Sequence, residues 1–246
     1  MRFLRVIGIL GGSSDQATAD YYRLLNQGVR ERLGGWNTAE LVVNSLNFAL
    51  AERWVRNGLW SEAGASLNER ARALERAGAE LLICVSNTLH RVADAFTAGL
   101  RIPFLHIVDP TARAIQAAGL RRVALLGTKP VMATDFLKRR YEERFGIQIL
   151  APEAGEQDDV DRIIFDELCR GRLMPESKAR YLEIVDGLRE RGAEGVILGC
   201  TEIRLLIGQR DRPELPLFDT LALHVEAAVD LALQAPAAGL GQGGLG

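Results

Sequence analysis

A repeated segment constrains the fold of this chain more than any other feature. Residues 78–88, GAELLICVSNT, align with residues 192–202, GAEGVILGCTE, and near the start of each half residues 9–11 align with residues 125–127 at almost the same offset. Each half therefore begins with a strand that ends in glycine and later reaches a Gly-Ala-Glu turn, an apolar strand and a polar turn. Repeated α/β lobes usually face each other across a cleft. The alternative is that Gly-Ala-Glu before an apolar strand is merely a common α/β sequence.

Short apolar runs alternate with segments of helical period along both halves. Residues 15–33 carry apolar or aromatic residues on one face, with Ser13 or Ser14 as N-cap and Gly34-Gly35 as the end of the helix. Strands this uniformly apolar are typical of parallel sheets covered by helices on both faces. The predicted strands are residues 6–10, 40–44, 81–85, 104–107, 123–126, 148–150 and 195–198.

These elements predict an α/β fold with two similar lobes, each a parallel sheet flanked by helices. A pseudo-twofold axis would relate the lobes, and the active site would lie in the cleft between them. We expect residues 1–115, together with a returning C-terminal helix in residues 221–246, to form the first lobe, and residues 116–220 to form the second. Residues 239–246 are rich in glycine and are expected to fray.

Composition excludes several classes of function. The 246 residues are 48% hydrophobic and 25% charged, as in a soluble globular chain. The 30 Lys and Arg residues and 32 Asp and Glu residues interleave and give a formal net charge of -2, so no nucleic-acid partner is expected. No apolar run approaches a membrane span and no signal-peptide pattern is present, which predicts a cytoplasmic protein without a membrane partner.

The cysteines direct attention to thiol chemistry. Cys84, Cys169 and Cys200 are an odd number without a CxxC spacing, and the histidines show no metal-ligand spacing, so neither a disulfide framework nor a metal site is expected. Cys200 lies between a buried strand and a predicted helix at 203–207. The amides and the dipole at such a helix start lower the pKa of a thiol. We therefore interpret Cys200 as the reactive thiol, with a small apolar filler as its alternative, and Cys84 and Cys169 as inert.

Polar turns follow the predicted strands. Ser86 stands at the position equivalent to Cys200 and precedes a predicted helix at 89–97. Amides and hydroxyls at helix starts can hold a carboxylate or phosphate, although each hydroxyl taken alone is also explained by helix capping. No GxGxxG, P-loop or Gly-x-Ser-x-Gly motif is present. A small anionic ligand is therefore predicted, and its candidate binding residues are Gly12, Ser13, Ser14, Asn87, Thr88, Thr128, Thr201 and Glu202.

The same residues resemble the cofactor-independent aspartate/glutamate racemases, in particular the aspartate racemase branch, which includes broad-specificity amino-acid racemases. The resemblance runs roughly from Val6 to His224. Its main carriers are GILGGSS at residues 8–14, Ser86-Asn87-Thr88 and Gly199-Cys200-Thr201-Glu202. It implies two lobes with the site between them, a homodimer, and catalysis with no pyridoxal phosphate, no other cofactor and no metal.

The resemblance also implies a mechanism, from which this chain departs at one position. The family usually places two cysteines on opposite sides of the substrate α-carbon, but Ser86 stands where the first cysteine belongs. A thiol ionises far more readily than a hydroxyl. Some racemases of this branch have threonine at that position and prefer L-enantiomers. Cys200 would then take the α-proton of an L-amino acid, and Ser86, through water, would supply one on the other face. Ser86 is compatible with a natural residue and with an engineered replacement of cysteine.

The predicted function is racemisation of an acidic amino acid, aspartate or glutamate, with selectivity for the L-enantiomer. A carboxylate side chain would need a cation, and Arg53 and Arg170 are the candidates. Two alternatives remain. One is a single-cysteine relative within the superfamily, such as a malonate decarboxylase or a maleate isomerase. The other is a protein that binds a dicarboxylate without catalysis.

Overall fold

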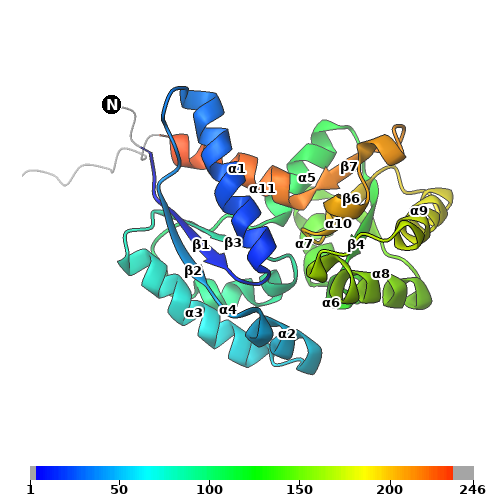
Figure 1. Ribbon diagram of the computed structural model, residues 1–246, viewed down its shortest axis with the longest axis horizontal. Coiled ribbons are helices and arrows are strands. Elements are labelled where there is room, and N and C mark those ends of the chain that lie inside the picture. Colours follow the sequence, from blue (N-terminus) through cyan, green and yellow to red (C-terminus); the bar gives the residue numbers. More distant parts are fainter. Residues whose placement is uncertain (1–3, 235–246) are drawn as a thin grey trace, which may run out of the picture.

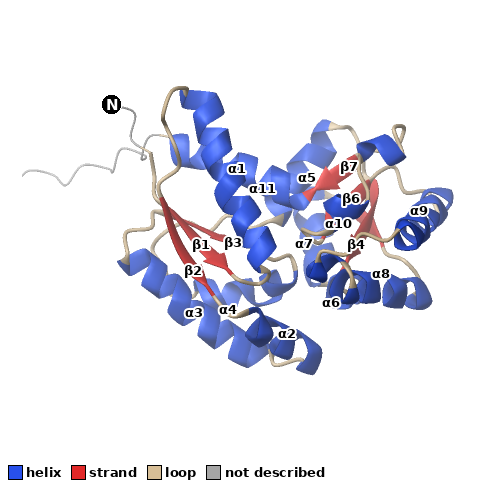
Figure 2. Ribbon diagram, viewed as in Figure 1, coloured by secondary structure: helices blue, strands red, loops and turns tan. Residues whose placement is uncertain are grey.

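The computed structural model describes residues 4–234, which form two parallel sheets flanked by helices (Figures 1 and 2). The first sheet has the order β2-β1-β3, with β1 (Ile7–Gly11), β2 (Leu41–Ser45) and β3 (Leu81–Cys84). The second has the order β5-β4-β6-β7, with β4 (Arg122–Gly127), β5 (Gln148–Leu150), β6 (Val196–Gly199) and β7 (Leu217–Asp219). The predicted α/β fold with two lobes is confirmed.

The helices connect and cover the strands. Helix α1 (Asp15–Leu33) has the predicted bounds, because Ser14 caps its first turn through a bond from the Ala17 amide and Gly34 ends it. The predicted helix at 89–97 is divided into a 3-10 helix, η1 (Thr88–Val92), and helix α4 (Ala93–Thr97). The remaining elements are α2 (Phe48–Asn57), α3 (Trp60–Arg76), α6 (Lys129–Ala133), α7 (Phe136–Phe145), α8 (Ala154–Asp166), η2 (Leu168–Arg170), α9 (Pro175–Glu190), α10 (Ile203–Leu206) and η3 (Gln209–Asp211).

The strand predicted at 104–107 is reduced to a single parallel bridge between Phe104 and Leu82. The Leu105 amide still donates to the Leu82 carbonyl, but the Ile107 amide donates to the His90 ring and α5 (Val108–Ala117) begins directly afterwards, so the chain leaves the sheet. The second lobe has the three-residue strand β7 at the corresponding place, which the sequence analysis did not predict.

Helices α5 and α11 (Thr220–Leu233) are exchanged between the sheets. The apolar face of α5 packs in a core formed by the second sheet, whereas α11 packs beside α1 over the first sheet. Figure 1 shows this arrangement, with α11 in orange beside α1 in blue. The predicted lobe boundary after residue 115 therefore falls inside α5. The end of the predicted C-terminal segment, residues 235–246, lies outside the described residues together with the glycine-rich tail.

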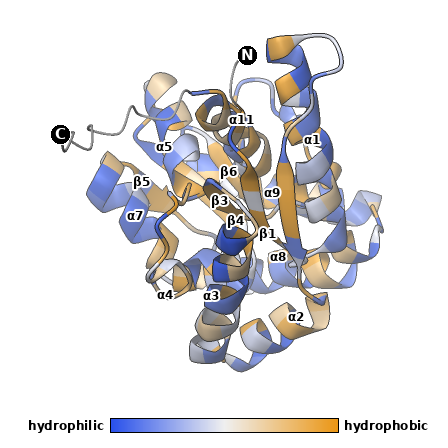
Figure 3. Cartoon of the chain, turned by 90° about the vertical axis from the view of Figure 1, so that its left-hand side faces the viewer, coloured by the Kyte–Doolittle hydropathy of each residue, from blue (hydrophilic) through white to orange (hydrophobic). Residues whose placement is uncertain are grey.

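Alternate residues of each strand face different cores, which explains the uniformly apolar strands. In β4, Ala124 and Leu126 pack on the side of α8 and α9, whereas Val123 and Leu125 pack on the side of α5 and α7. Figure 3 shows orange strands inside and blue on the outer faces of the helices. Polar chemistry is thus confined to the ends of the strands. Within residues 4–234, no helix combines the length and the apolar character needed to cross a membrane.

Candidate active site

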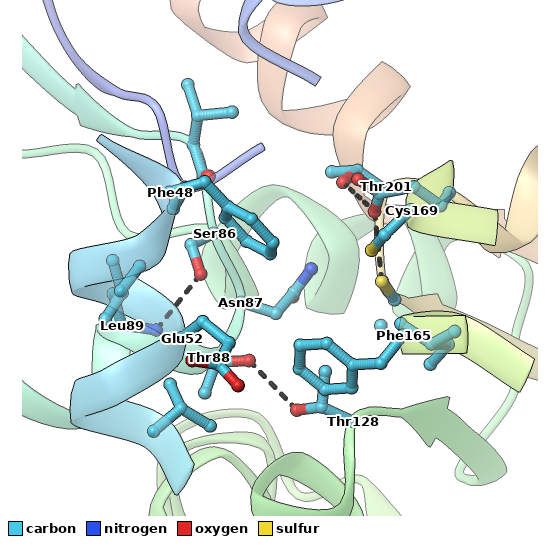
Figure 4. Close-up of a pocket in the computed structure, with 18 residues that line it drawn as sticks. Phe48, Glu52, Ser86, Asn87, Thr88, Leu89, Thr128, Phe165, Cys169 and Thr201 are labelled. Atoms are coloured by element: carbon cyan, nitrogen blue, oxygen red, sulfur yellow. Dashed lines mark hydrogen bonds between the residues drawn. The ribbon is translucent and has the colours of Figure 1, made fainter. Parts of the chain in front are cut away.

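A pocket with about 540 Å³ of empty volume lies where the carboxyl ends of the strands of the two sheets meet (Figure 4). Parallel strands bring all of these ends to the same edge of a sheet, where ligands of α/β proteins bind. The pocket lies between turns of both lobes. Its polar lining residues are Ser13, Glu52, Ser86, Asn87, Thr88, Thr128, Cys200, Thr201 and Glu202.

Ser86 and Cys200 line this pocket from equivalent turns of the two lobes. Ser86 follows β3, and Cys200 directly follows β6. Figure 4 shows Ser86 on one side of the pocket and Thr201, the neighbour of Cys200, on the other. The Ser86 hydroxyl oxygen accepts a bond of 3.2 Å from the Leu89 amide, which leaves its hydrogen free to donate.

The thiol of Cys200 is bonded to a buried carboxylate. Its Sγ donates to Oε2 of Glu202 at 3.1 Å, and the hydroxyl of Thr201 donates to the same oxygen at 2.6 Å. The other oxygen, Oε1, accepts a bond of 2.5 Å from Ser14 Oγ. Glu202 is 5% exposed, so these three donors replace the water that the carboxylate loses.

This environment raises the pKa of Cys200 well above its ordinary value, because the thiol is desolvated and the charge of Glu202 lies beside it. The predicted lowering of this pKa is wrong. Helix α10, which follows, has only four residues and supplies little dipole, while Glu202 places a negative charge where the prediction assumed a positive helix end. Without substrate, Cys200 is therefore protonated at neutral pH.

The other two cysteines differ in position. Cys84 is fully buried in β3, whereas Cys169 in η2 lines the pocket, which the sequence analysis did not foresee. Burial raises the pKa of each to about 12. Both are therefore protonated near neutral pH, and their interpretation as inert residues stays a prediction.

Two predicted binding residues support the pocket wall without lining it. The Gly12 amide donates to Thr18 Oγ1 at 2.8 Å, so it is not available to a ligand. Ser14 uses its side chain to cap α1 and to hold Glu202. Gly12 and Ser14 thus position the residues around them.

Neither predicted arginine faces the pocket. Arg53 forms an ion pair with Glu62 of α3, and the Arg170 side chain is 61% exposed beside Asp166. Neither of these candidate carboxylate partners is therefore among the lining residues of the pocket. Helix α2 explains the position of Arg53, because residues 48, 51, 52 and 55 form its pocket-facing stripe and position 53 lies on another face.

The helices contribute a part of the pocket wall that the sequence patterns did not indicate. Phe48, Glu52 and Val55 come from α2, and Ile164 and Phe165 come from the end of α8. The i, i+3, i+4, i+7 spacing in α2 was a readable signal of one helix face, but nothing in the sequence indicated that this face would meet α8. Among the described residues, the lining contains two carboxylates and no lysine, arginine or histidine.

The buried ring of His90 is bonded to the backbone of the Ser86 turn. The Ile107 amide donates to Nε2 of His90 at 3.1 Å, so Nδ1 carries the proton and donates to the Ser86 carbonyl at 2.5 Å. Burial lowers the pKa of His90 to about 3. This neutral ring therefore holds the backbone of the Ser86 turn in place.

A second buried ring joins the lobe's helices to its sheet. His224 of α11 donates from Nε2 to the Leu105 carbonyl at 3.0 Å and accepts at Nδ1 from the Tyr21 hydroxyl at 2.8 Å. Burial lowers its pKa to about 4. This bonding gives His90 and His224 a structural role. In the part of the chain that the structure describes, no group of three or more His, Cys, Asp or Glu side chains could hold a metal ion.

Comparison with known proteins agrees with this architecture. The family model described as Asp/Glu/Hydantoin racemase matches residues 7–228. A candidate Asp/Glu racemase of known structure from Yersinia pestis is 38% identical, with a TM-score of 0.87, and the match covers 94% of this chain and 100% of that one. An aspartate racemase homologue from Pyrococcus horikoshii OT3 is 36% identical, with a TM-score of 0.81 and the same coverage.

A curated relative is more distant in sequence. The broad specificity amino-acid racemase RacX of Bacillus subtilis (strain 168) is 20% identical over 228 residues, which are 91% of this chain and 96% of that protein. The family match spans most of the chain and includes both polar turns of the pocket. The chain therefore belongs to the Asp/Glu/hydantoin racemase family.

Proposed function

We propose that this isomerase racemises amino acids without a cofactor and that Cys200 and Ser86 handle protons on opposite faces of the substrate α-carbon. Membership in the racemase family supports amino-acid racemisation. The observation that carries the residue assignment is that both side chains line one pocket from equivalent turns of two similar lobes. A racemase needs such a pair, because the α-proton leaves on one face and returns on the other.

Neutral donors are available for the α-carboxylate and for the charge that develops on it. Asn87 donates one amide hydrogen to Thr220 Oγ1 at 3.0 Å, and its second hydrogen stays free. The hydroxyls of Thr88 and Thr128 share one bond of 3.0 Å across the lobes, which uses one of their two hydrogens. Fixed donors of this kind stabilise an enolate-like charge in a pocket with little water.

Glu202 provides a route by which the Cys200 thiol becomes a base. The thiol proton moves from Sγ to Oε2 of Glu202, which leaves a thiolate beside a neutral carboxyl group. The thiolate then takes the α-proton of an L-substrate, and the electron pair of the broken C–H bond passes into the carboxylate. Return of a proton from Cys200 regenerates the L-enantiomer.

Inversion requires a proton from the side of Ser86. A serine alkoxide forms much less readily than a thiolate, so the proton comes from water bonded to the free hydroxyl hydrogen of Ser86. The hydroxide that this leaves is neutralised through solvent by the proton held on Glu202, which restores the Glu202 carboxylate and the Cys200 thiol. This step is slower than return from Cys200. The result is the handedness expected from the sequence, with exchange on the L-enantiomer faster than inversion.

Activity on aspartate or glutamate remains a prediction. The alternatives, which are malonate decarboxylation, maleate isomerisation and dicarboxylate binding without catalysis, also remain predictions. Each of these ligands carries a second carboxylate, and no cation lines the pocket among the described residues. The homodimer and the cytoplasmic location also stay predictions. Light scattering after gel filtration tests the dimer.

The test of the proposed function is loss of the α-proton signal of L- and D-amino acids in D₂O, followed by proton NMR. Cys200→Ala is expected to slow exchange by 10²-fold or more, a range typical of a lost acid–base residue. Cys84→Ala is the matched control, because it removes a buried thiol of β3 that does not line the pocket and is expected to leave exchange intact. Undiminished exchange in Cys200→Ala, or CO₂ release from malonates without amino-acid exchange, would contradict the proposal.

A further inference from the structure

We infer that Glu52 selects substrates whose side chain ends in a cation, an ammonium or guanidinium group. This inference rests on the proposed function and adds to it the class of amino acid that the pocket accepts. An acidic substrate side chain would need a cation in the pocket wall, but the charged residue that the helices contribute to this wall is the carboxylate Glu52.

The part of the pocket wall that α2 and α8 contribute is apolar apart from Glu52. Helix α2 contributes Phe48, Ala51 and Val55 beside Glu52, and α8 contributes Ile164 and Phe165. Figure 4 shows Phe48, Glu52 and Phe165 around the space in front of Ser86 and Thr88. The side chain of a substrate held by its α-carboxylate at the polar turns fills the space that these helix residues line.

Glu52 is incompletely neutralised. Its side chain is 45% exposed, and its Oε1 lies 3.7 Å from Nε of Arg56. Arg56 is also shared with Asp161, at 3.2 Å, and its guanidinium stacks on the Phe165 ring at 4.3 Å from the centroid. Two carboxylates thus compete for one guanidinium, and the group as a whole is negative.

The nearby cations face a different cavity. Arg56, Arg91 and Lys129 line a neighbouring space, which shares Val55 and Phe165 with the pocket. Lys129 is paired with Asp158, and Arg91 stacks on the Trp60 ring. The ring of Phe165 therefore lies between these cations and a substrate in the pocket.

A long cationic side chain satisfies both properties of the wall. Its methylene groups pack on the apolar residues, and its terminal cation meets the Glu52 carboxylate and the faces of the aromatic rings. A glutamate side chain would place a second carboxylate near Glu52 and lose water without gaining a cation. The wall therefore favours lysine-like over glutamate-like substrates.

The other role open to Glu52 is binding of the substrate α-ammonium group. That group is common to every amino acid, so removal of the Glu52 charge would then slow all substrates equally. A side-chain role predicts an effect on cationic substrates alone. Comparison of lysine with norleucine, which has a neutral side chain of similar length, separates these roles.

The experiment measures kcat/KM for α-proton exchange in D₂O with L-lysine, L-norleucine and L-glutamate. For the natural chain, lysine is expected to exceed norleucine by about 10-fold or more, the gain typical of a charged hydrogen bond, and glutamate to be the slowest. Glu52→Gln is expected to lose that advantage and to leave norleucine within about twofold. Glu69→Gln, at an exposed site on α3, is the matched control and changes neither ratio.

Glu52→Lys provides a second variant, which is expected to reverse the order of lysine and glutamate. The inference is overturned if glutamate exceeds lysine in the natural chain, or if Glu52→Gln lowers all three substrates equally. Exchange with norleucine but without any preference for lysine overturns the inference and leaves the proposed function standing. Absence of exchange with every amino acid overturns the proposed function itself.

Discussion

Ser14 Oγ donates a 2.5 Å hydrogen bond to Oε1 of Glu202 and so joins the N-cap of α1 in one lobe to the Cys200 turn of the other. Ser14 Oγ also accepts a hydrogen bond from the Ala17 amide. One side chain therefore begins a helix and fixes the carboxylate that binds the thiol. The two lobes are linked at the residue that controls the protonation of Cys200.

Ser14→Ala is expected to lower the free energy of unfolding by about 1–3 kcal/mol, because it removes an N-cap and a bond to a buried carboxylate. Urea denaturation measures the change. Asn47→Ala, which removes the N-cap of α2 without touching Glu202, is the control and should cost about 1 kcal/mol. Two results together would show that the Ser14–Glu202 bond contributes nothing. Ser14→Ala would lower the free energy of unfolding no more than Asn47→Ala does, and the effects of Ser14→Ala and Glu202→Gln would add in the double variant.

Glu202→Gln is expected to shift the titration of Cys200 to lower pH, because the charge of Glu202 helps to raise the pKa of this thiol. In the natural chain, alkylation of Cys200 by iodoacetamide should be slow at pH 7 and accelerate as pH rises and the thiolate forms. Peptide-resolved mass spectrometry separates Cys200 from the other two cysteines. The same variant should slow proton exchange, since the proton acceptor is lost. An unchanged alkylation profile would remove Glu202 from the account.

Gly12→Ala is expected to destabilise the fold strongly. Gly12 has φ +86°, and a Cβ at this position would lie 2.0 Å from the Leu46 carbonyl oxygen, so the turn after β1 would have to move. Gly187→Ala is the matched control, because nothing lies within 4 Å of its Cβ position in α9. The control should raise stability by about 0.5–1 kcal/mol through helix propensity. Similar melting temperatures for both variants would contradict this reading of the turn.

The buried histidines predict a loss of stability in mild acid. In the folded chain burial lowers the pKa of His90 to about 3 and of His224 to about 4, from 6.5, and the pKa of His106 is lowered as well. The unfolded chain therefore binds more protons between pH 6.5 and 4. Its free energy falls relative to the native state by up to about 1.4 kcal/mol per pH unit for each histidine.

Urea denaturation at pH 7, 6 and 5 measures this slope. The stability that depends on neutral histidines in the folded chain is fully present above pH 6.5 and is lost as the pH falls toward 4. His224→Gln should reduce the slope by the contribution of one proton, whatever its effect on stability at pH 7. A flat profile between pH 7 and 5 would contradict this, because it would mean that the histidines take up protons equally in the folded and unfolded chain.

The fold was predictable because its determinants are local and repeated. The uniformly apolar runs indicated buried parallel strands, and the repeat indicated two sheets. The bounds of α1 followed from the Ser14 cap and from Gly34 at its end. The strand expected at 104–107 failed because the His90 side chain takes the Ile107 amide, a contact between residues 17 positions apart. The exchange of α5 and α11 between the sheets likewise depends on packing that no local pattern records.

The polar turns of the site were predictable for the same reason, since they follow strands whose carboxyl ends must meet. Glu52 and Phe165 were not, because they lie on helices whose mutual approach closes the pocket only in three dimensions. The charges of Arg53 and Arg170 make them candidates, but the sequence does not show which face of its helix each residue occupies. The pKa of Cys200 was misjudged because desolvation and Glu202 outweigh a four-residue helix.

The most direct test of the central claim compares exchange with inversion for both enantiomers of one substrate. Enantiomers have equal free energies in water, so the kcat/KM values for inversion in the two directions must be equal, and handedness can appear only as exchange with retention. Proton NMR in D₂O measures exchange, and chiral chromatography of the same samples measures inversion. We predict that the L-enantiomer exchanges faster than it inverts, that the D-enantiomer exchanges no faster than it inverts, and that Ser86→Cys speeds exchange of the D-enantiomer. Faster exchange than inversion for the D-enantiomer, or its insensitivity to Ser86→Cys, would contradict the assignment of Cys200 and Ser86 to opposite faces.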